Sequence, residues 1–279
     1  MAKKSKKGGK GQKGKKAPMS LREVVAALEA MAPCQLAESW DNVGLLAGDL
    51  DAEVRAALLC IDLMPAVVDE AIAAEVELVI AYHPPIFRPV TRLVTPGPDM
   101  EAGVFRCIRR GIAIYSPHTS LDVATGGTND VLADLCGATE TTPLGPVNED
   151  GLGIGRVGRL RDPATLRALA KRLKRKGGAD HVSLVGNPDA TIERVVICVG
   201  AAGSLPFSLD LGPGDAIVTG EIRHHDALRI QRLGTNAIAL SHWSSERPTL
   251  AVLQQRLSGE LPALAFSLSR ADREPFLRV

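Results

Sequence analysis

Five of the six histidines in this sequence lie just past short apolar runs of the kind that form buried strands. In open α/β sheets, ligands bind at the edge where the carboxyl ends of the strands lie. The histidines therefore predict one site, assembled from strand ends that are far apart in the sequence. The segments concerned are 82–85 after the run 77–81, 116–122 after 112–115, 220–226 after 216–219, and 241–246 after 237–240.

The side chains at these strand ends are of types that bind metals and carry protons. His118 and Asp122, for example, lie four residues apart, and imidazole and carboxylate groups serve both purposes. A single histidine after a strand is more often a hydrogen-bonded loop residue. The repetition of the same arrangement in four segments favours a functional site instead.

The elements that must position these side chains alternate between strand and helix in the first half of the chain. Ser20 and Glu23 form a capping box that opens an amphipathic helix. The order strand, helix, strand, helix predicts an α/β fold with a mainly parallel sheet. We expect strands at 57–61, 77–81 and 112–115, and helices at 65–74, 101–109 and 128–135.

The second half repeats this order after a segment rich in Thr, Pro, Gly and acidic residues. We therefore expect an N-terminal α/β lobe at 18–137, a linker at 138–152 and a C-terminal α/β lobe at 153–279. The segment 153–158 matches G-x-G-x-x-G, but it lacks the preceding strand and following helix of a dinucleotide site. The small residues at 200–204 follow a strand at 195–199, and they form either an anion-binding turn or a plain tight turn. A basic helix from 163 with a solvated face, a helix at 248–257 and a strand at 264–268 complete the half.

One loop of the first half, residues 38–45, carries an aromatic and two polar side chains. Trp40 is either a packing anchor in a turn or the wall of a pocket. In the second case Asp41 and Asn42 would supply hydrogen bonds to a ligand. The sequence leaves both alternatives open.

Composition places the protein among ordinary soluble globular chains. Of its 279 residues, 45% are hydrophobic and 23% charged, and no apolar run approaches the roughly 18 residues of a membrane span. The five cysteines show no C-x-x-C spacing, which is typical of reduced thiols in a cytoplasmic protein. No apolar segment of a signal peptide follows the basic N-terminus.

The net charge of +1 conceals a basic N-terminal tail on an acidic body. Residues 1–17 contain eight lysines and no acid, and the remaining 25 basic and 32 acidic residues give a balance of −7. A Lys- and Gly-rich segment cannot bury a core, so we expect this tail to be disordered. It is either a solvated extension or a tether that contacts RNA, DNA or another polyanion.

Taken together, five segments resemble the Nif-three-like dinuclear metal-centre family, whose members are also described as GTP cyclohydrolase I type 2 homologues. The resemblance covers roughly residues 20–279. It implies two α/β lobes with a two-metal site between them, and assembly into a toroidal homohexamer. The segments are 39–44, 83–87, 118–122, 219–221 and 242–246.

The resemblance also implies a set of metal ligands, namely His83, Asp122, His242 and Glu246. Tyr82 stands where the family pattern has a further histidine, and a phenol is a poor ligand at neutral pH because its pKa is near 10. We therefore expect one well-occupied metal position and one weak or empty position. The competing possibility is that Tyr82 binds as a phenolate between two cations. Two imidazoles and two carboxylates suit Zn, Mn or Fe, at one or two ions per chain.

The function that follows from the resemblance is hydrolysis of a nucleotide or a related phosphorylated heterocycle by metal-activated water. A bound metal can lower the pKa of water to roughly 7. His118, His225 and Glu221 are candidates for proton transfer or for orienting the ligands. Two alternatives are a two-metal phosphoesterase and a non-catalytic metal-binding regulatory or scaffold protein, and the tyrosine at position 82 favours the latter somewhat.

Overall fold

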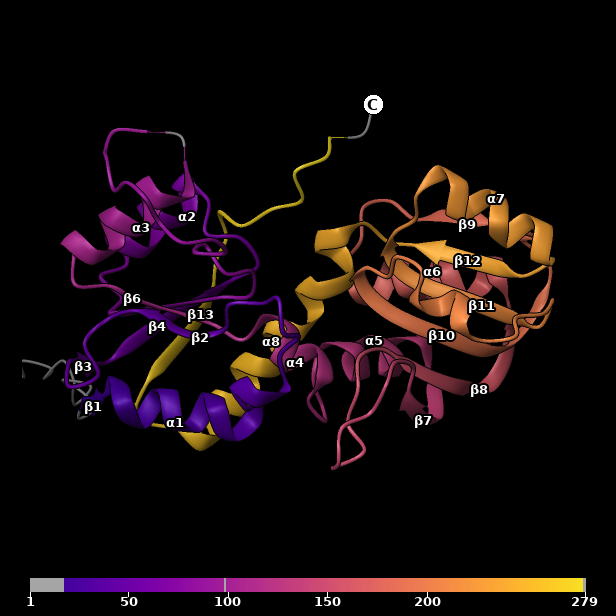
Figure 1. Ribbon diagram of the computed structural model, residues 1–279, viewed down its shortest axis with the longest axis horizontal. Coiled ribbons are helices and arrows are strands. Elements are labelled where there is room, and N and C mark those ends of the chain that lie inside the picture. The colour runs from indigo at the N-terminus through magenta and orange to yellow at the C-terminus, as the bar shows by residue number, and fades with distance from the viewer. Residues whose placement is uncertain (1–17, 98, 278–279) are drawn as a thin grey trace, which may run out of the picture.

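The computed structural model describes residues 18–97 and 99–277, and the tail expected at 1–17 lies outside the described residues. The described chain forms an α/β fold with one five-stranded and one six-stranded sheet, together with a small two-stranded pair (Figure 1). Within this part of the chain, no helix combines the length and apolarity needed to cross a membrane. The small pair consists of β1 (Met19–Ser20) and β3 (Glu53–Val54).

The five-stranded sheet has the order β13-β4-β5-β6-β2 and is mainly parallel, as predicted. Helices α2 (Pro65–Ala73) and α3 (Met100–Arg109) connect its parallel strands. The central strands are buried along their whole length, which explains their continuous apolar sequences. The strands are β4 (Ala56–Cys60), β5 (Leu78–Ala81), β6 (Ala113–Ser116), β13 (Ala265–Leu268) and the antiparallel β2 (Gly44–Ala47).

The six-stranded sheet, of order β7-β8-β10-β11-β12-β9, is mixed, so the expectation of mainly parallel sheets is wrong for this part. Only β10, β11 and β12 run parallel, with α7 (His224–Leu233) joining the last two. Strand β7 occupies the beginning of the segment expected to be a linker. It pairs antiparallel with β8 and forms one edge of the six-stranded sheet. The strands are β7 (Ala138–Pro143), β8 (Arg156–Thr165), β9 (Ser183–Val185), β10 (Thr191–Ala201), β11 (Asp215–Glu221) and β12 (Asn236–Ala239).

Side chains that cap the first turn fix where two of the helices begin. The capping box at Ser20 and Glu23 opens α1 (Leu21–Met31), as predicted. Helix α6 (Leu166–Gly177) begins later than the expected residue 163, because the side chain of Thr165 caps it. Further helical segments are η1 (Cys34–Leu36), α4 (His118–Val123), α5 (Thr128–Cys136) and η2 (Leu205–Ser208).

Helix α8 (His242–Glu260) lies between the two large sheets (Figure 1). It begins six residues before the expected start at 248, because the Ser241 side chain accepts a hydrogen bond from the Ser244 amide and so caps it. Its apolar side chains pack into the core of the five-stranded sheet, and its N-terminal part contacts β10 and β11 of the other. Strand β13 follows it and pairs with β4, although the sequence placed 264–268 with the C-terminal lobe. The two sheets are therefore tied together by residues 242–268.

The cysteines are free, as the sequence predicts. Four of them are buried and Cys34 is partly buried. Burial raises the pKa of Cys107 to about 11 and of Cys198 to about 12, so these thiols are neutral near pH 7.

Candidate metal centre

The ligand atoms of His83, His242 and Glu246 lie within 4.8 Å of one another. His83 follows the carboxyl end of β5, whereas the other two lie one turn apart on the first turns of α8. Helix α8 starts just after the carboxyl end of β12 in the six-stranded sheet and packs against the five-stranded sheet. It therefore brings His242 and Glu246 to the end of β5, where His83 lies. Three of the four ligands implied by the resemblance therefore converge.

The spacing of these atoms fits a bound cation. His242 Nε2 lies 3.2 Å from Glu246 Oε1, and His83 Nε2 lies 3.3 Å from Glu246 Oε2. Ligand atoms held about 2.0–2.1 Å from one tetrahedral ion are themselves about 3.3 Å apart. Glu246 is 3% exposed, and its Oε2 atom is buried without a hydrogen-bond partner. Burying this oxygen without a hydrogen bond is costly, and positive charge beside it, from a bound cation or from a protonated His83, would offset that cost.

Gly200, at the end of β10, leaves room for the cluster. A Cβ atom at this position would lie 2.6 Å from Glu246 Oε1 and 3.0 Å from His242 Nε2, and the residue has a φ of +60°. Its amide donates to Ser245 Oγ at 2.9 Å, so this N–H is not offered to an anion. The small residue is therefore needed for close approach to the cluster.

Two further carboxylates fix the orientation of the imidazoles. Asp62 Oδ1 lies 2.9 Å from His83 Nδ1, and Glu221 Oε1 lies 3.0 Å from His242 Nδ1. Such pairing holds the proton on Nδ1 and leaves Nε2 as the electron-pair donor to a metal. Glu221 was predicted to belong to the site. Asp62 was missed, although it also follows the end of a strand, β4, and that signal could have identified it.

The electrostatics of the cluster favour positive charge. Burial alone would lower the pKa of His83, but the contacts with Asp62 and Glu246 outweigh it and raise this pKa to about 10. Contact with Glu246 likewise raises the pKa of His242. Burial would raise the pKa of Glu246, but His242 and His83 hold it below its usual range. Without a metal, protons on the imidazoles supply the charge that a cation would otherwise bring.

Asp122, the fourth implied ligand, is held by Tyr82. Both side chains are buried, and the Tyr82 hydroxyl donates a hydrogen bond to Asp122 Oδ1. Burial and the charges of Asp122 and Glu246 raise the pKa of Tyr82 well above its usual value, so the phenol keeps its proton where no cation lies beside it. Burial also raises the pKa of Asp122 to about 6, although the bond from Tyr82 opposes this. Among the described residues, Asp122 is not a member of the three-residue cluster.

The other predicted histidines differ in their positions. The ring of His118 lies 5.3 Å from that of His83 and nearly perpendicular to it, and its Nδ1 lies 2.8 Å from Asp41 Oδ1. His118 therefore borders the cluster. His225 lies exposed on α7 with its ring 5.4 Å from that of His224, so the structure does not bring it to the cluster.

The loop before β2 is bound to the site through its polar residues. Asp41 accepts hydrogen bonds from the Thr119 amide and contacts His118, and Asn42 donates to the carbonyl of Ile86. Trp40 is 57% exposed, so it does not act as a packing anchor. The structure matches neither alternative in full, because Trp40 faces solvent while Asp41 and Asn42 are bonded to the chain itself rather than offered to a ligand.

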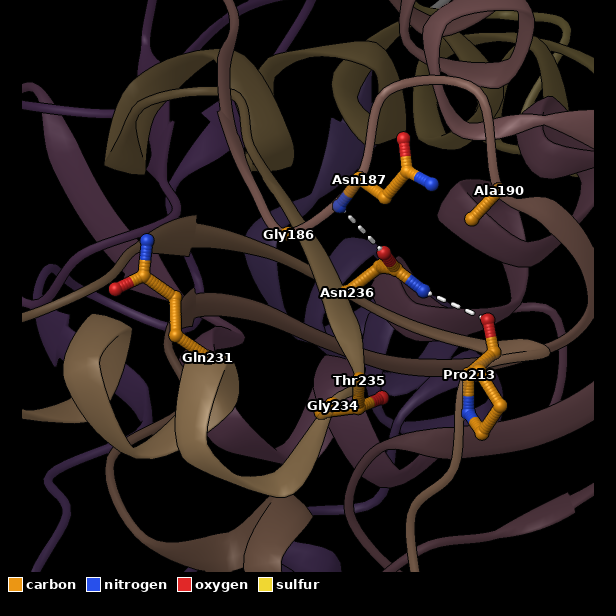
Figure 2. Close-up of a pocket in the computed structure, with 8 residues that line it drawn as sticks. All are labelled: Gly186, Asn187, Ala190, Pro213, Gln231, Gly234, Thr235 and Asn236. Atoms are coloured by element: carbon orange, nitrogen blue, oxygen red, sulfur yellow. Dashed lines mark hydrogen bonds between the residues drawn. The ribbon is translucent and has the colours of Figure 1, made fainter.

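A cavity of about 420 Å³ adjoins the cluster and is lined in part by Glu221, Ser241 and His242. Another pocket, of about 460 Å³, lies at the amino end of β12 (Figure 2). There the Asn236 side chain accepts from the Asn187 amide and donates to the Pro213 carbonyl, so its polar atoms are engaged by the chain itself. The cavity beside the cluster is the better candidate, because ligands bind at the carboxyl ends of strands.

Comparisons with known proteins agree over almost the whole chain. The family model Duf34/NIF3 (NGG1p interacting factor 3) matches residues 19–275. A Drosophila melanogaster NIF3-like protein 1 is 37% identical over 270 residues, covering 93% of this chain and 89% of the relative. A Clostridium perfringens GTP cyclohydrolase 1 type 2 homolog is 28% identical and covers 92% and 99%. The crystal structure of a Staphylococcus aureus hypothetical protein superposes with a TM-score of 0.83 at 27% identity, covering 94% and 100%.

Proposed function

The chain belongs to the Duf34/NIF3 family, and we propose that it is a divalent-metal-dependent hydrolase acting on a nucleotide or a related phosphorylated heterocycle. The observation that carries this proposal is the convergence of His83, His242 and Glu246 around a buried carboxylate oxygen without a hydrogen-bond partner. The substrate class is supported by relatives that bear the name GTP cyclohydrolase 1 type 2 homolog.

The side chains have separate roles in this proposal. His83, His242 and Glu246 would hold Zn, Mn or Fe, and a bound ion of this kind polarises the substrate and activates water. Asp62 and Glu221 orient the two imidazoles. His118 carries protons: its Nδ1 faces Asp41, which leaves Nε2 free to accept a proton from the reacting water.

The larger organisation of the proposal follows from the resemblance of the sequence to the family. The two sheets would form two lobes with the metal site between them, and six chains would assemble into a ring. The second metal position would depend on Asp122, Glu246 and water, and would be weak because Tyr82 replaces a histidine. We place the protein in the cytoplasm, and we propose that the Lys-rich residues 1–17 contact polyanions.

The experiment that tests the hydrolase is a product assay on protein loaded separately with Zn, Mn and Fe. GTP and other nucleotides are incubated with the protein, and purine-ring opening and phosphate release are followed separately. Glu246→Gln should abolish product formation, because the amide carries no negative charge to hold the ion. Glu260→Gln, at the exposed end of the same helix, is the matched control and should retain activity.

A non-catalytic metal-binding regulatory or scaffold protein is the second candidate, and the bond between Tyr82 and Asp122 favours it. That bond occupies a carboxylate that a second ion would need. The same assay separates the candidates. Ring opening supports a cyclohydrolase, phosphate release alone supports a phosphoesterase, and metal binding without any product supports the non-catalytic role.

A further inference from the structure

Two aromatic side chains stand exposed beside the metal cluster. Trp40 is 57% exposed and Phe87 is 46% exposed, and their ring centroids lie 6.1 Å apart at an angle of 55°. Aromatic residues make up only 3% of this chain. Paired exposure of two large rings in such a chain marks a surface that binds something.

A row of ring contacts connects this aromatic pair to the candidate ligands. The Trp40 ring lies 6.1 Å from that of His118, and the His118 ring lies 5.3 Å from that of His83. His83 in turn lies 5.3 Å from His242, ring to ring. A molecule that rests on Trp40 and Phe87 therefore lies within a few ring widths of the metal cluster.

The two loops that carry the aromatic pair are held in place by their neighbouring residues. Asp41, whose side chain is fully buried, contacts His118 Nδ1 at 2.8 Å and the Thr119 amide at 3.1 Å. Asn42 donates to the carbonyl of Ile86 at 2.5 Å, which joins the Trp40 loop to the Phe87 loop. The rings are thus exposed on a fixed support, which reduces the entropy lost when a ligand binds.

We propose that Trp40 and Phe87 form a stacking surface for the planar heterocyclic ring of the substrate, a nucleobase in the case of a nucleotide. This inference rests on the proposed function and names the part of the substrate that the exposed rings bind. Because the planes of the Trp40 and Phe87 rings are tilted by 55°, a planar heterocycle cannot lie parallel to both rings at once. It therefore stacks on the face of one ring and meets the edge of the other. Such stacking recognises the heterocycle and holds it beside the metal cluster.

The test measures binding by calorimetry on the metal-loaded, full-length protein, with GTP, guanosine and inorganic triphosphate as probes. Trp40→Leu and Phe87→Leu should each weaken the binding of GTP and guanosine by about tenfold or more, the order expected for loss of one base-stacking contact. Triphosphate binding and metal content should stay unchanged. Trp40→Phe should bind guanosine within about threefold of the wild type, because it keeps a ring. Leu228→Ala, an exposed apolar residue on α7, is the control.

Three results would overturn the inference. One is guanosine affinity unchanged in both leucine variants, and another is the absence of guanosine binding to the wild type. The third is a change in molecular mass by light scattering in Trp40→Leu, which would make this surface a contact between copies of the chain. If the wild-type protein binds GTP but does not hydrolyse it, the proposed hydrolase activity is wrong and the stacking surface is still supported. If Trp40→Leu hydrolyses the substrate with an unchanged KM, the hydrolase activity is supported and the stacking surface is wrong.

Discussion

The hydroxyl of Tyr82 donates a hydrogen bond to Asp122, and we expect this contact, together with the absence of an imidazole at position 82, to weaken a second metal position. Replacing Tyr82 with histidine removes the phenol and adds an imidazole beside His83. We predict that Tyr82→His raises the metal content by up to one ion per chain, because Asp122 is released and a ligand is gained. Elemental analysis of both proteins after equilibration with a defined metal measures this.

The control for this substitution is Tyr82→Phe, which frees Asp122 without supplying a ligand. Its metal content should remain close to that of the wild type. If the wild type already holds two ions tightly and Tyr82→His does not change that number, the assignment of a weak second position is wrong.

Asp41 contributes to stability in a way that depends on pH. Burial would raise its pKa, but His118, Thr119 and the Asn42 amide lower it from 3.8 to about 2. Because the folded-state pKa is depressed, the stabilisation is complete above pH 3.8 and is lost as the pH falls through about 2. Asp41→Asn should therefore lower the unfolding free energy by about 1–2 kcal/mol at pH 7.

Urea denaturation of both proteins at a series of pH values checks this prediction. The difference between wild type and Asp41→Asn should narrow as the pH falls below 4, where the carboxylate of the unfolded chain takes up a proton while that of the folded protein stays ionised down to about pH 2. A difference that stays constant from pH 7 to pH 3 would show that the charge of Asp41 is not responsible.

Among the elements, the segment after β13 fixes the start of α8. Asp272 accepts hydrogen bonds from the Ile61 amide at 2.8 Å and from Trp243 Nε1 at 3.1 Å. The Glu274 carboxylate accepts a hydrogen bond from Ser241, a residue with a φ of +108° that precedes the helix. These contacts tie the first turn of α8, and hence His242, to the end of β4.

We predict that Asp272→Ala lowers the unfolding free energy by about 2–3 kcal/mol, because buried amide and indole donors lose their acceptor. It should also weaken metal binding, since the first turn of α8 loses its anchor. Chemical denaturation and a metal titration measure the two effects. Asp51→Ala, at a highly exposed carboxylate, is the control and should change neither. Full stability in Asp272→Ala would contradict this role.

The strand ends could be predicted from the sequence because each buried strand is a short apolar run with polar residues directly after it. This pattern indicated the segments that hold His83, His242 and Glu246, and the resemblance to the family then assigned these side chains as ligands. The early start of α8 was missed because Pro248 suggested a first turn there, whereas the helix accommodates this proline inside. The pairing of β13 with β4 could not be predicted, since it joins segments about 210 residues apart and no local pattern encodes it.

For the whole molecule, the family could be predicted from five short segments in the right order, and the comparison over residues 19–275 confirms it. The position of Asp122 relative to the cluster could not be predicted. It depends on how Tyr82, a residue outside the family pattern, packs in the core of the five-stranded sheet.

Deleting residues 1–17 tests the division between the basic tail and the acidic body. We predict an unchanged melting temperature and metal content, because a Lys- and Gly-rich segment contributes no apolar core. Binding to heparin or nucleic acid at low salt should be lost if the tail is the polyanion contact. A clear fall in melting temperature on deletion would show that the tail docks on the body.

The most direct test of the central claim, that residues from both parts of the fold hold one metal centre, is metal content per chain in wild type and Glu246→Gln. We predict at least about one Zn, Mn or Fe ion per wild-type chain and an affinity at least about tenfold weaker in the variant. Circular dichroism should show both proteins folded. A wild-type protein that binds no divalent metal, or a variant that binds it equally well, would contradict the account.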